Sequence, residues 1–336
     1  MVSEPLERAE ENPIEKMATS VYPPFALLAG MQLDLFSPLK DEPMSAEQIA
    51  AKIGVASAKL KPLLYALVVA GFLSVDSEFF SNTDAANRYL VKSSPSYVGD
   101  MHELLSTMWS AALKTAGSIR TGSPQAKLNY SEMSQGDLRQ FFRGEHPYAV
   151  EYGRDLVKRY DFSAYSALLD VCGGSGGLAI AVTEACPHIQ ATVVDLPKIT
   201  PVTQYYIDEA GAGNRVKVVT ANVVRDPLPG SYDAAVMSAF IQVLSPDDAR
   251  RAIKSVSKVM NPGGEIYIRG YGIIDNSRTS PQKLVGFNLV YINVYNDGQA
   301  YTEQEHKDWL EEAGFGNFRR TIQDDGSSII TAQKLK

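Results

Sequence analysis

A glycine-rich segment that follows an apolar run is the part of this 336-residue sequence best suited to chemistry. Residues 168–177 read Leu-Leu-Asp-Val-Cys-Gly-Gly-Ser-Gly-Gly, and Asp195 lies 19 positions after Gly176. Glycine allows a sharp turn and a close approach to a ligand, because no Cβ stands in the way. A carboxylate at this spacing is typical of a residue that binds ribose hydroxyl groups. The segment therefore predicts a strand, a turn and a helix around a cofactor that contains a nucleoside.

The order of the glycines distinguishes two classes of cofactor. A dinucleotide site has the spacing Gly-x-Gly-x-x-Gly and holds a pyrophosphate at the N-terminus of the following helix. Here the order from Asp170 to Gly176 is Asp-x-x-Gly-Gly-x-Gly, which is usual where the cofactor is S-adenosylmethionine, a molecule without phosphate. A third interpretation is a turn that only packs a helix against a sheet, and the presence of Asp195 argues against it.

A parallel sheet is needed to position these residues, and the second half of the chain has the pattern of one. Short apolar segments alternate with helical ones, and we expect a helix between each consecutive pair of strands, as in a sheet buried on both faces. Two further strands, joined by an Asp-Asp-Gly-Ser turn, predict a terminal antiparallel hairpin, which fits a doubly wound methyltransferase better than a dehydrogenase. The expected parallel strands are residues 167–171, 191–195, 216–220, 234–238 and 265–268, and the hairpin strands are residues 317–323 and 328–333.

The first half of the chain has the pattern of a winged helix, in which two helices precede a small hairpin. Ser45 and Gln48 are placed to form a capping box, and Gly54 is placed to end the helix that this box begins. The expected elements are helices over residues 21–36, 46–53 and 57–70 and strands over residues 72–75 and 78–81.

A winged helix either binds DNA or serves as a dimerisation scaffold. Residues 1–110 contain eight Lys and Arg against fourteen Asp and Glu, and the whole chain has a net charge of −7. DNA affinity depends mainly on the neutralisation of phosphates by basic residues. The charge balance therefore favours dimerisation over nucleic-acid binding.

Length and composition predict two domains, a winged-helix domain over residues 1–120 and a cofactor-binding domain over residues 121–336. The acidic N-terminus does not resemble a secretory signal, and the longest apolar run, residues 63–73, is too short to span a bilayer. Cys172 and Cys186 are expected at opposite ends of one helix, too far apart for a disulfide. These features favour a cytoplasmic protein with free thiols and no membrane association.

Six segments in a fixed order resemble the two-domain small-molecule O-methyltransferases of plants and bacteria, which include caffeate, hydroxyindole and anthracycline methyltransferases. The resemblance covers nearly the whole length of the chain. It implies an α/β fold with a Rossmann-like class I methyltransferase domain, a winged-helix domain that forms a homodimer, and S-adenosylmethionine as the cofactor. The segments are LLDVCGGSGG, ATVVDLP, VVTANVVRDPLP, MSAFIQVLSPDDARR, MNPGGEIYI and YTEQEHKDWLEEAGF.

The resemblance also implies which residues contact the cofactor. Asp195 would bind the ribose hydroxyl groups, and Leu196 would lie against the adenine. Asn222 stands where the family usually has an aspartate that accepts the adenine amino group, and an amide carbonyl can accept the same hydrogen bond. The glycines that would line the methionine and ribose are Gly173, Gly174 and Gly176.

Three further positions vary more within the family. Cys172 replaces a common glycine, and we expect binding to survive the change. Ser238 matches a polar residue that often contacts the cofactor. Arg139 resembles an arginine that holds the methionine carboxylate in some members, with a solvated surface residue as the alternative.

The residues expected to remove a proton from the acceptor are absent. Many relatives have a catalytic histidine after the fourth strand, where this chain has Gln242, which cannot act as a general base near neutral pH. The two glutamates that assist this histidine would fall near Gly270 and Ala300. All three acid–base positions are therefore empty.

Three hypotheses follow from this absence. In the first, the acceptor is already acidic and proximity does most of the catalysis. In the second, another residue is the base, and His146 is the best candidate. The alternative for His146 is an ordinary surface or capping histidine. In the third, the fold binds the cofactor but does other chemistry, such as a cyclisation or hydroxylation. A non-enzymatic competitor is a winged-helix regulator that senses the cofactor. The choice between oxygen and carbon as the methyl acceptor stays open.

The acceptor-binding residues are expected on a helix over residues 282–295. Asn288, Tyr291 and Tyr295 share one face of it by their spacing, and in the family this helix covers the acceptor. Trp109 lies on a long helix that often contributes to the same site. Ordinary core packing is the alternative for all four. The four histidines have no spacing typical of metal ligands, so no metal site is expected.

Overall fold

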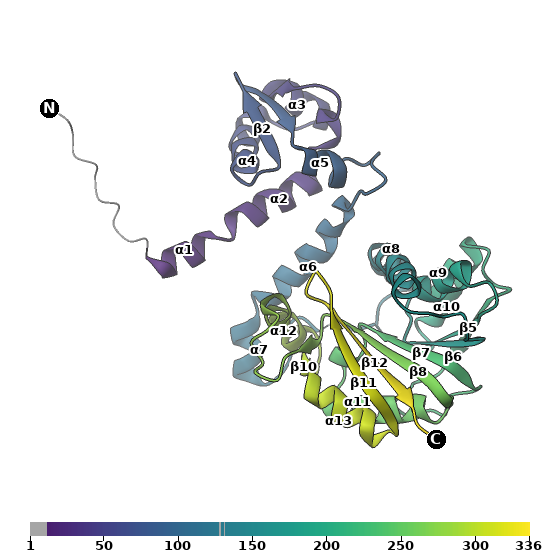
Figure 1. Cartoon of the computed structure of the whole chain (residues 1–336). Coiled ribbons are helices and arrows are strands. Elements are labelled where there is room, and N and C mark those ends of the chain that lie inside the picture. Colours follow the sequence, from purple (N-terminus) through teal and green to yellow (C-terminus); the bar gives the residue numbers. More distant parts are fainter. Residues whose placement is uncertain (1–11, 128, 131) are drawn as a thin grey trace. The chain divides into compact units, whose positions relative to one another are not determined.

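The computed structural model describes residues 12–336 except residues 128 and 131. The chain divides into two compact units, residues 1–107 and 108–336 (Figure 1). Each unit has its own buried core. Within the described residues, no helix combines the length and the apolar character that crossing a membrane requires.

The first unit has the predicted order of helices and a small sheet. The capping box is confirmed, because Ser45 Oγ accepts a hydrogen bond from Gln48 N at 3.3 Å and Gln48 Oε1 accepts one from Ser45 N at 2.8 Å. A short strand that the sequence did not suggest, β1, pairs with β3. The elements are α1 Pro13–Thr19, α2 Tyr22–Gln32, β1 Met44–Ser45, α3 Ala46–Ile53, α4 Ser57–Val69, β2 Leu73–Asp76, β3 Phe79–Asn82 and α5 Asp84–Tyr89.

The helix expected over residues 21–36 is wrong at its C-terminal end, since α2 stops at Gln32. Asp34 has a φ of 49°, in the left-handed region that a continuing α-helix does not use. A short 3₁₀ turn at Ser37–Leu39 follows.

The second unit is built on a seven-stranded sheet in the order β11-β12-β8-β7-β4-β5-β6. Strands β8, β7, β4, β5 and β6 are parallel, and β12 is antiparallel to both of its neighbours, which confirms the predicted sheet with its terminal hairpin. The strands are β4 Ala167–Val171, β5 Gln190–Asp195, β6 Val216–Thr220, β7 Tyr232–Ser238, β8 Met260–Gly270, β11 Phe315–Ile322 and β12 Ser328–Lys334.

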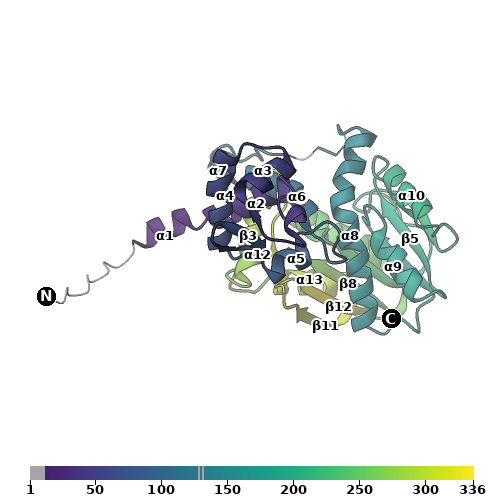
Figure 2. The same cartoon turned by 90° about the horizontal axis from the view of Figure 1, so that it is seen from above.

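Helices cover both faces of this sheet (Figure 1 and Figure 2). One buried cluster joins the sheet to α8, α9 and α10, and another joins it to α11 and α13. A separate pair of short strands, β9 Ile273–Ile274 and β10 Tyr301–Thr302, lies beside α12 and α13. The helices are α7 Thr115–Thr121, α8 Gln135–Arg159, α9 Gly177–Ala185, α10 Thr200–Glu209, α11 Pro246–Ser257, α12 Gln282–Val294 and α13 Glu303–Glu312, and α6 His102–Ala112 spans the boundary between the units.

Two expectations for this unit are wrong. The chain between β6 and β7, residues 221–231, contains no α-helix, because Pro227 and Pro229 lack the N–H groups a helix needs and Gly230 has a φ of 87°. Cys172 lies in the turn before α9 and not at an end of that helix, whereas Cys186 directly follows it. Both thiols are free, as expected.

Candidate active site

The glycine-rich turn presents bare backbone above the C-terminal end of β4. Gly174 and Gly176 have φ values of 56° and 73°, where a side chain would be strained. A Cβ at Gly173 would lie 2.6 Å from Asp170 Oδ2, and a Cβ at Gly174 would lie 2.6 Å from the ring of Phe142. Glycine is therefore required by the space around the turn as well as by its conformation.

Cys172 stands in this turn at the position where the resemblance predicts a glycine. It has a φ of 54°, and its N–H donates to the carbonyl of Val194 at 2.7 Å, which anchors the turn to β5. Burial raises the pKa of the Cys172 thiol. This thiol therefore stays protonated and unreactive at neutral pH.

Asp195 ties β5 to the glycine turn. Its Oδ2 accepts a hydrogen bond from Gly174 N at 2.9 Å, and its Oδ1 accepts one from Leu196 N at 2.7 Å. Burial raises the pKa of Asp195 to about 6, against the lowering effect of these two bonds. Each carboxylate oxygen keeps a further lone pair for a ligand hydroxyl group.

Asp170 is a buried carboxyl group beneath the same turn. Its side chain is 1% exposed, and neither oxygen has a hydrogen-bond partner among the described residues. Burial raises its pKa to about 7, and the nearby charge of Asp195 adds to this effect. An unpartnered buried carboxylate is costly, so this position favours a ligand that brings a positive charge or a donor.

Three predicted cofactor residues follow the C-terminal ends of neighbouring strands. Leu196 follows β5 and is 39% exposed. Asn222 follows β6 and closes a local turn, since its Oδ1 accepts from Val224 N at 3.0 Å; a second lone pair of that carbonyl remains. Ser238 is the last residue of β7 and is half-buried. The structure thus brings these residues to the sheet edge that carries Asp195 and the glycine turn, where ligands of open α/β sheets bind.

Two predicted residues lie on α8. Arg139 is exposed, and its guanidinium lies 5.9 Å from the ring centroid of Tyr205 on α10. His146 lies against the glycine turn, with Nδ1 at 2.9 Å from Ser175 Oγ and its ring stacked on Tyr206 at a centroid distance of 4.2 Å. Burial lowers the pKa of His146, so its imidazole is neutral at neutral pH.

The three positions where the resemblance predicts acid–base residues hold Gln242, Gly270 and Ala300, none of which is titratable. Gln242 is 7% exposed in the short turn after β7. A side chain at Gly272 would collide with Gln242, and a Cβ at Gly270 would lie 3.7 Å from Gln242 Nε2. Ala300 is 1% exposed, and its N–H donates to Asn288 Oδ1 at 2.6 Å.

The predicted acceptor residues of α12 belong to a row of aromatic rings. The rings of Tyr271 and Phe287 stack with their centroids 5.3 Å apart. The ring centroid of Tyr291 lies 6.1 Å from that of Phe287 and 6.2 Å from that of Tyr295. Asn288 lies on the same helix but is engaged with the backbone of Ala300. Trp109 is half-buried on α6.

Comparisons with known proteins match both parts of the chain. A family model described as an O-methyltransferase domain matches residues 120–316, and a model described as an O-methyltransferase dimerisation domain matches residues 16–92. The chain belongs to the O-methyltransferase family. It is an S-adenosylmethionine-dependent methyltransferase.

Individual relatives are distant but extend over most of the methyltransferase. The tetracenomycin polyketide synthesis 8-O-methyl transferase TcmO of Streptomyces glaucescens is 26% identical over 96% of both chains. An L-tyrosine C(3)-methyltransferase of Streptomyces lavendulae is 24% identical over 86% of this chain and 82% of its own. The structure of a putative O-methyltransferase from Nostoc punctiforme covers 96% of this chain and 100% of its own, with a TM-score of 0.86 and 19% identity, and shows the same fold.

The residues of the methyltransferase fit its cofactor. S-adenosylmethionine carries positive charges on its ammonium group and its sulfur, and Asp170 is a buried carboxyl group that lacks a partner among the described residues. Its ribose needs hydrogen-bond acceptors, which Asp195 supplies beside the bare backbone of Gly174. Its adenine needs apolar surface, which Leu196 leaves exposed.

Three polar residues near this region escaped the sequence reasoning. Glu145 is half-buried on α8, where burial raises its pKa. Burial also raises the pKa of Tyr130 and Tyr295, and the charge of Glu145 adds a smaller contribution to both. Asn293 is fully buried and joins α12 to α7 through Ser118 Oγ at 2.5 Å. Arg269 is 5% exposed in β8. Only its interruption of an apolar strand could have drawn attention to Arg269, and nothing in the sequence marks Glu145.

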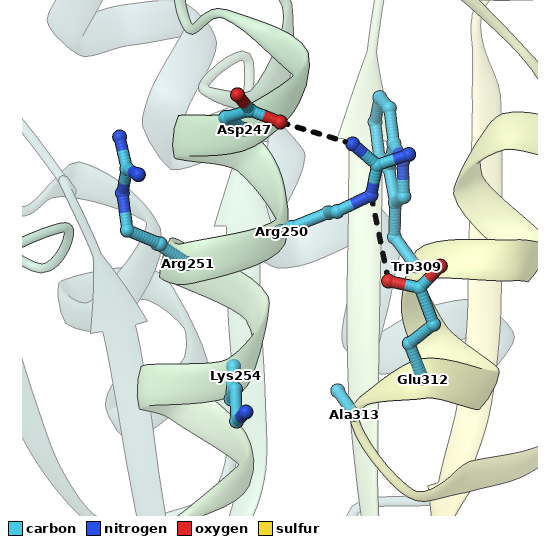
Figure 3. A pocket seen from close by; sticks show the side chains of 7 residues that line it. All are labelled: Asp247, Arg250, Arg251, Lys254, Trp309, Glu312 and Ala313. Carbon is cyan, nitrogen blue, oxygen red and sulfur yellow. Dashed lines mark hydrogen bonds and ion pairs between the residues drawn. The ribbon is translucent and has the colours of Figure 1, made fainter.

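A surface pocket of about 320 Å³ lies between α11 and α13 and contains none of the predicted site residues. Figure 3 shows Arg250 between Asp247 and Glu312, with which it forms ion pairs at 3.2 and 3.4 Å, and over the ring of Trp309. The positive charge of Arg250 is therefore already paired with two carboxylates of the pocket.

Proposed function

We propose that this methyltransferase acts on a small aromatic or polyketide-like acceptor whose reacting group is acidic, so that proximity and orientation replace a histidine base. Oxygen is favoured as the methyl acceptor because the family model that matches residues 120–316 is described as an O-methyltransferase domain. Carbon is the alternative because the relatives include an L-tyrosine C(3)-methyltransferase. The observation that carries the proposal is the chemistry of Gln242, Gly270 and Ala300, none of which can take a proton.

The residues of this chain would bind and orient the two reactants. When bound, S-adenosylmethionine supplies an electrophilic methyl group. Asp195 would hold the ribose and Asp170 would offset the positive charge beneath the glycine turn. Gln242 can donate and accept hydrogen bonds without changing its charge, so it would orient the acceptor, while the aromatic row from Tyr271 to Tyr295 would stack on it.

His146 is the alternative base. Its contact with Ser175 Oγ and its stacking on Tyr206 instead favour a positioning role, in which the imidazole holds the glycine turn against α8. Loss of that contact would then affect cofactor binding more than the proton transfer.

The test measures the turnover of a series of phenols with decreasing pKa at one fixed pH. The release of S-adenosylhomocysteine reports the rate. We expect the rate to rise as the phenol pKa falls toward the working pH, because the protein supplies no base and only the ionised phenol reacts. Equal rates for acidic and weakly acidic phenols would contradict the proposal. Calorimetry with S-adenosylhomocysteine comes first, since a failure to bind would remove the cofactor on which the proposal depends.

We also propose that the methyltransferase is a homodimer formed through its first unit. Helix α1 has no buried residue, although it carries large apolar side chains. Ile14 and Met17 are 75% and 72% exposed, and Tyr22, at the start of α2, is 64% exposed. Large exposed apolar side chains in one segment are typical of an interaction surface, and the dimerisation model covers residues 16–92. Sedimentation should show a dimer, and the double variant Met17→Asp/Tyr22→Asp should dissociate it. A wild-type monomer would contradict this.

A further inference from the structure

Arg269 is a buried cation without a counter-charge. Its side chain is 5% exposed, and among the described residues it makes neither a hydrogen bond nor an ion pair; its guanidinium carbon lies 3.4 Å from the ring centroid of Tyr152 on α8. The other deeply buried arginine of this unit shows what is missing. Arg320 forms an ion pair with Glu303 at 3.1 Å and donates to the carbonyls of Ile273 and Ile274. A buried charge is costly unless it is paired, so Arg269 is expected to have a partner that arrives with a ligand.

The register of the sheet places Arg269 at the edge where ligands bind. Arg269 pairs with Ser238, the last residue of β7, and β8 itself ends at Gly270. Successive side chains of a strand alternate between faces, so Arg269 shares the face of Tyr267, which belongs to the buried cluster under α8 and α9. This is also the face on which Tyr152 lies.

The strand order separates Arg269 from the ribose-binding side of the site. The neighbouring strands of the sheet follow one another in the order β8-β7-β4-β5. From β8 it is therefore two strand spacings to β4, which precedes the glycine turn, and three to β5, which ends at Asp195. At about 4.8 Å per strand this puts Arg269 roughly 10 Å from β4, on the side away from Asp195. The predicted ribose- and adenine-binding residues thus lie at the ends of β5 and β6. Arg269, on β8, lies beside Ser238 at the end of β7 and two positions before Tyr271 of the aromatic row.

We propose that Arg269 binds an oxyanion of the acceptor and thereby selects aromatic acceptors that carry a carboxylate or an ionised hydroxyl group. The inference rests on the proposed function and names its substrate class. One face of the guanidinium is covered by Tyr152, which leaves the N–H groups in its plane to form the paired hydrogen bonds that guanidinium makes with oxyanions. A fixed cation also lowers the pKa of a hydroxyl group beside it. Arg269 therefore supplies part of what the absent base would supply.

Two sets of naphthalene probes test the inference, because each isolates one source of the oxyanion. The first compares the affinities of 1-naphthoate and its neutral counterpart 1-naphthamide, measured by calorimetry on the full chain at neutral pH. The second follows 2-naphthol by absorption, since bound naphtholate and naphthol have different spectra. We expect the wild type to bind 1-naphthoate at least about tenfold more tightly than the amide, as for a hydrogen-bonded charge, or to bind 2-naphthol as naphtholate below its solution pKa.

Arg269→Met should abolish whichever response the wild type shows, and Arg269→Lys should keep part of it. Arg154→Met is the matched control, because it removes the same charge from an exposed position of α8 and should change neither response. The melting temperature and the affinity for S-adenosylhomocysteine show whether each variant is folded. A wild type that shows neither response overturns the inference, whatever the variants do, and so does a response that persists in Arg269→Met. Because no turnover is involved, these outcomes are distinct from a failure of methyl transfer, which the phenol series reports.

Discussion

Binding of the cofactor should release protons at neutral pH, and Asp170 should be their main source. In the ligand-free protein, burial and the charge of Asp195 raise the pKa of Asp170 to about 7, so this carboxyl group is about half protonated at pH 7. A ligand that brings a positive charge beneath the glycine turn favours the ionised form. S-adenosylhomocysteine keeps the ammonium group and therefore serves as the probe.

The magnitude follows from the two raised pKa values. If both carboxyl groups are ionised in the complex, a pKa of about 7 for Asp170 makes the affinity roughly tenfold lower at pH 6 than at pH 8, and a pKa of about 6 for Asp195 adds roughly a factor of two. The sign is fixed because a raised carboxyl pKa means that the free protein holds a proton which the complex must lose. Affinity therefore falls as the pH falls.

The assay is calorimetry with S-adenosylhomocysteine at pH 7 in buffers of different ionisation enthalpy, which counts the protons released. We expect about half a proton for the wild type and close to none from this position in Asp170→Asn, whose pH dependence should shrink to the part due to Asp195. Asp155→Asn is the control, because Asp155 pairs with Arg159 on α8 and should leave the count unchanged. No proton release from the wild type, or an unchanged count in Asp170→Asn, would refute the reasoning.

Three further predictions concern single residues. Asp195→Ala should weaken S-adenosylhomocysteine binding by about tenfold to a hundredfold, because it removes the acceptor of the ribose hydroxyl groups and of Gly174 N; unchanged affinity in calorimetry would show that the ribose is held elsewhere. His146→Ala should raise the KM for S-adenosylmethionine with less than a tenfold loss of kcat if His146 positions the glycine turn, whereas a larger loss of kcat would identify it as the base. His306 is fully buried, and burial lowers its pKa to about 4. As the pH falls below about 6.5, this histidine therefore takes up a proton in the unfolded protein before it does so in the folded protein, and the free energy of unfolding should decline by about 3 kcal/mol between pH 6.5 and 4. Urea unfolding of His306→Gln should show a shallower decline, and an equal decline would exclude His306 as its cause.

The fold of the second unit was predictable where local sequence decides structure. The parallel strands contain short apolar runs, such as Leu168-Leu169 in β4 and Val193-Val194 in β5. Ser245 caps α11, with Oγ accepting from Asp248 N at 3.2 Å. The missing helix at residues 221–231 shows the limit of alternation as a signal. Pro227 and Pro229 are visible in the sequence, and they should have outweighed the expectation that every pair of strands encloses a helix.

The site was predictable only as far as its residues are neighbours in sequence or end adjacent strands. The glycine turn and Asp195 meet because β4 and β5 are parallel neighbours, and that follows from topology. The surroundings of Arg269 depend on α8 lying across β8, where Tyr152 is 117 positions earlier in the chain. Burial without a counter-charge is a property of the packed molecule, so the sequence marks Arg269 only as a charged residue that interrupts an apolar strand.

The two uncompensated charges of the sheet edge give the proposals a common physical basis. Asp170 is a buried carboxyl group whose oxygens have no hydrogen-bond partner among the residues described. Arg269 is a buried arginine whose guanidinium contacts the ring of Tyr152 and forms no ion pair with those residues. One strand, β7, lies between them, and no ion pair joins them. Because groups that are fixed before the reactants arrive need no reorganisation during the reaction, such an edge would bind a cationic methyl donor over β4 and an anionic acceptor toward β8.

Attack of an anion on a cation neutralises charge, and a buried site of low dielectric favours that change. An acceptor that arrives ionised would then need no base, which would account for Gln242, Gly270 and Ala300 at the three positions where the resemblance predicts acid–base residues.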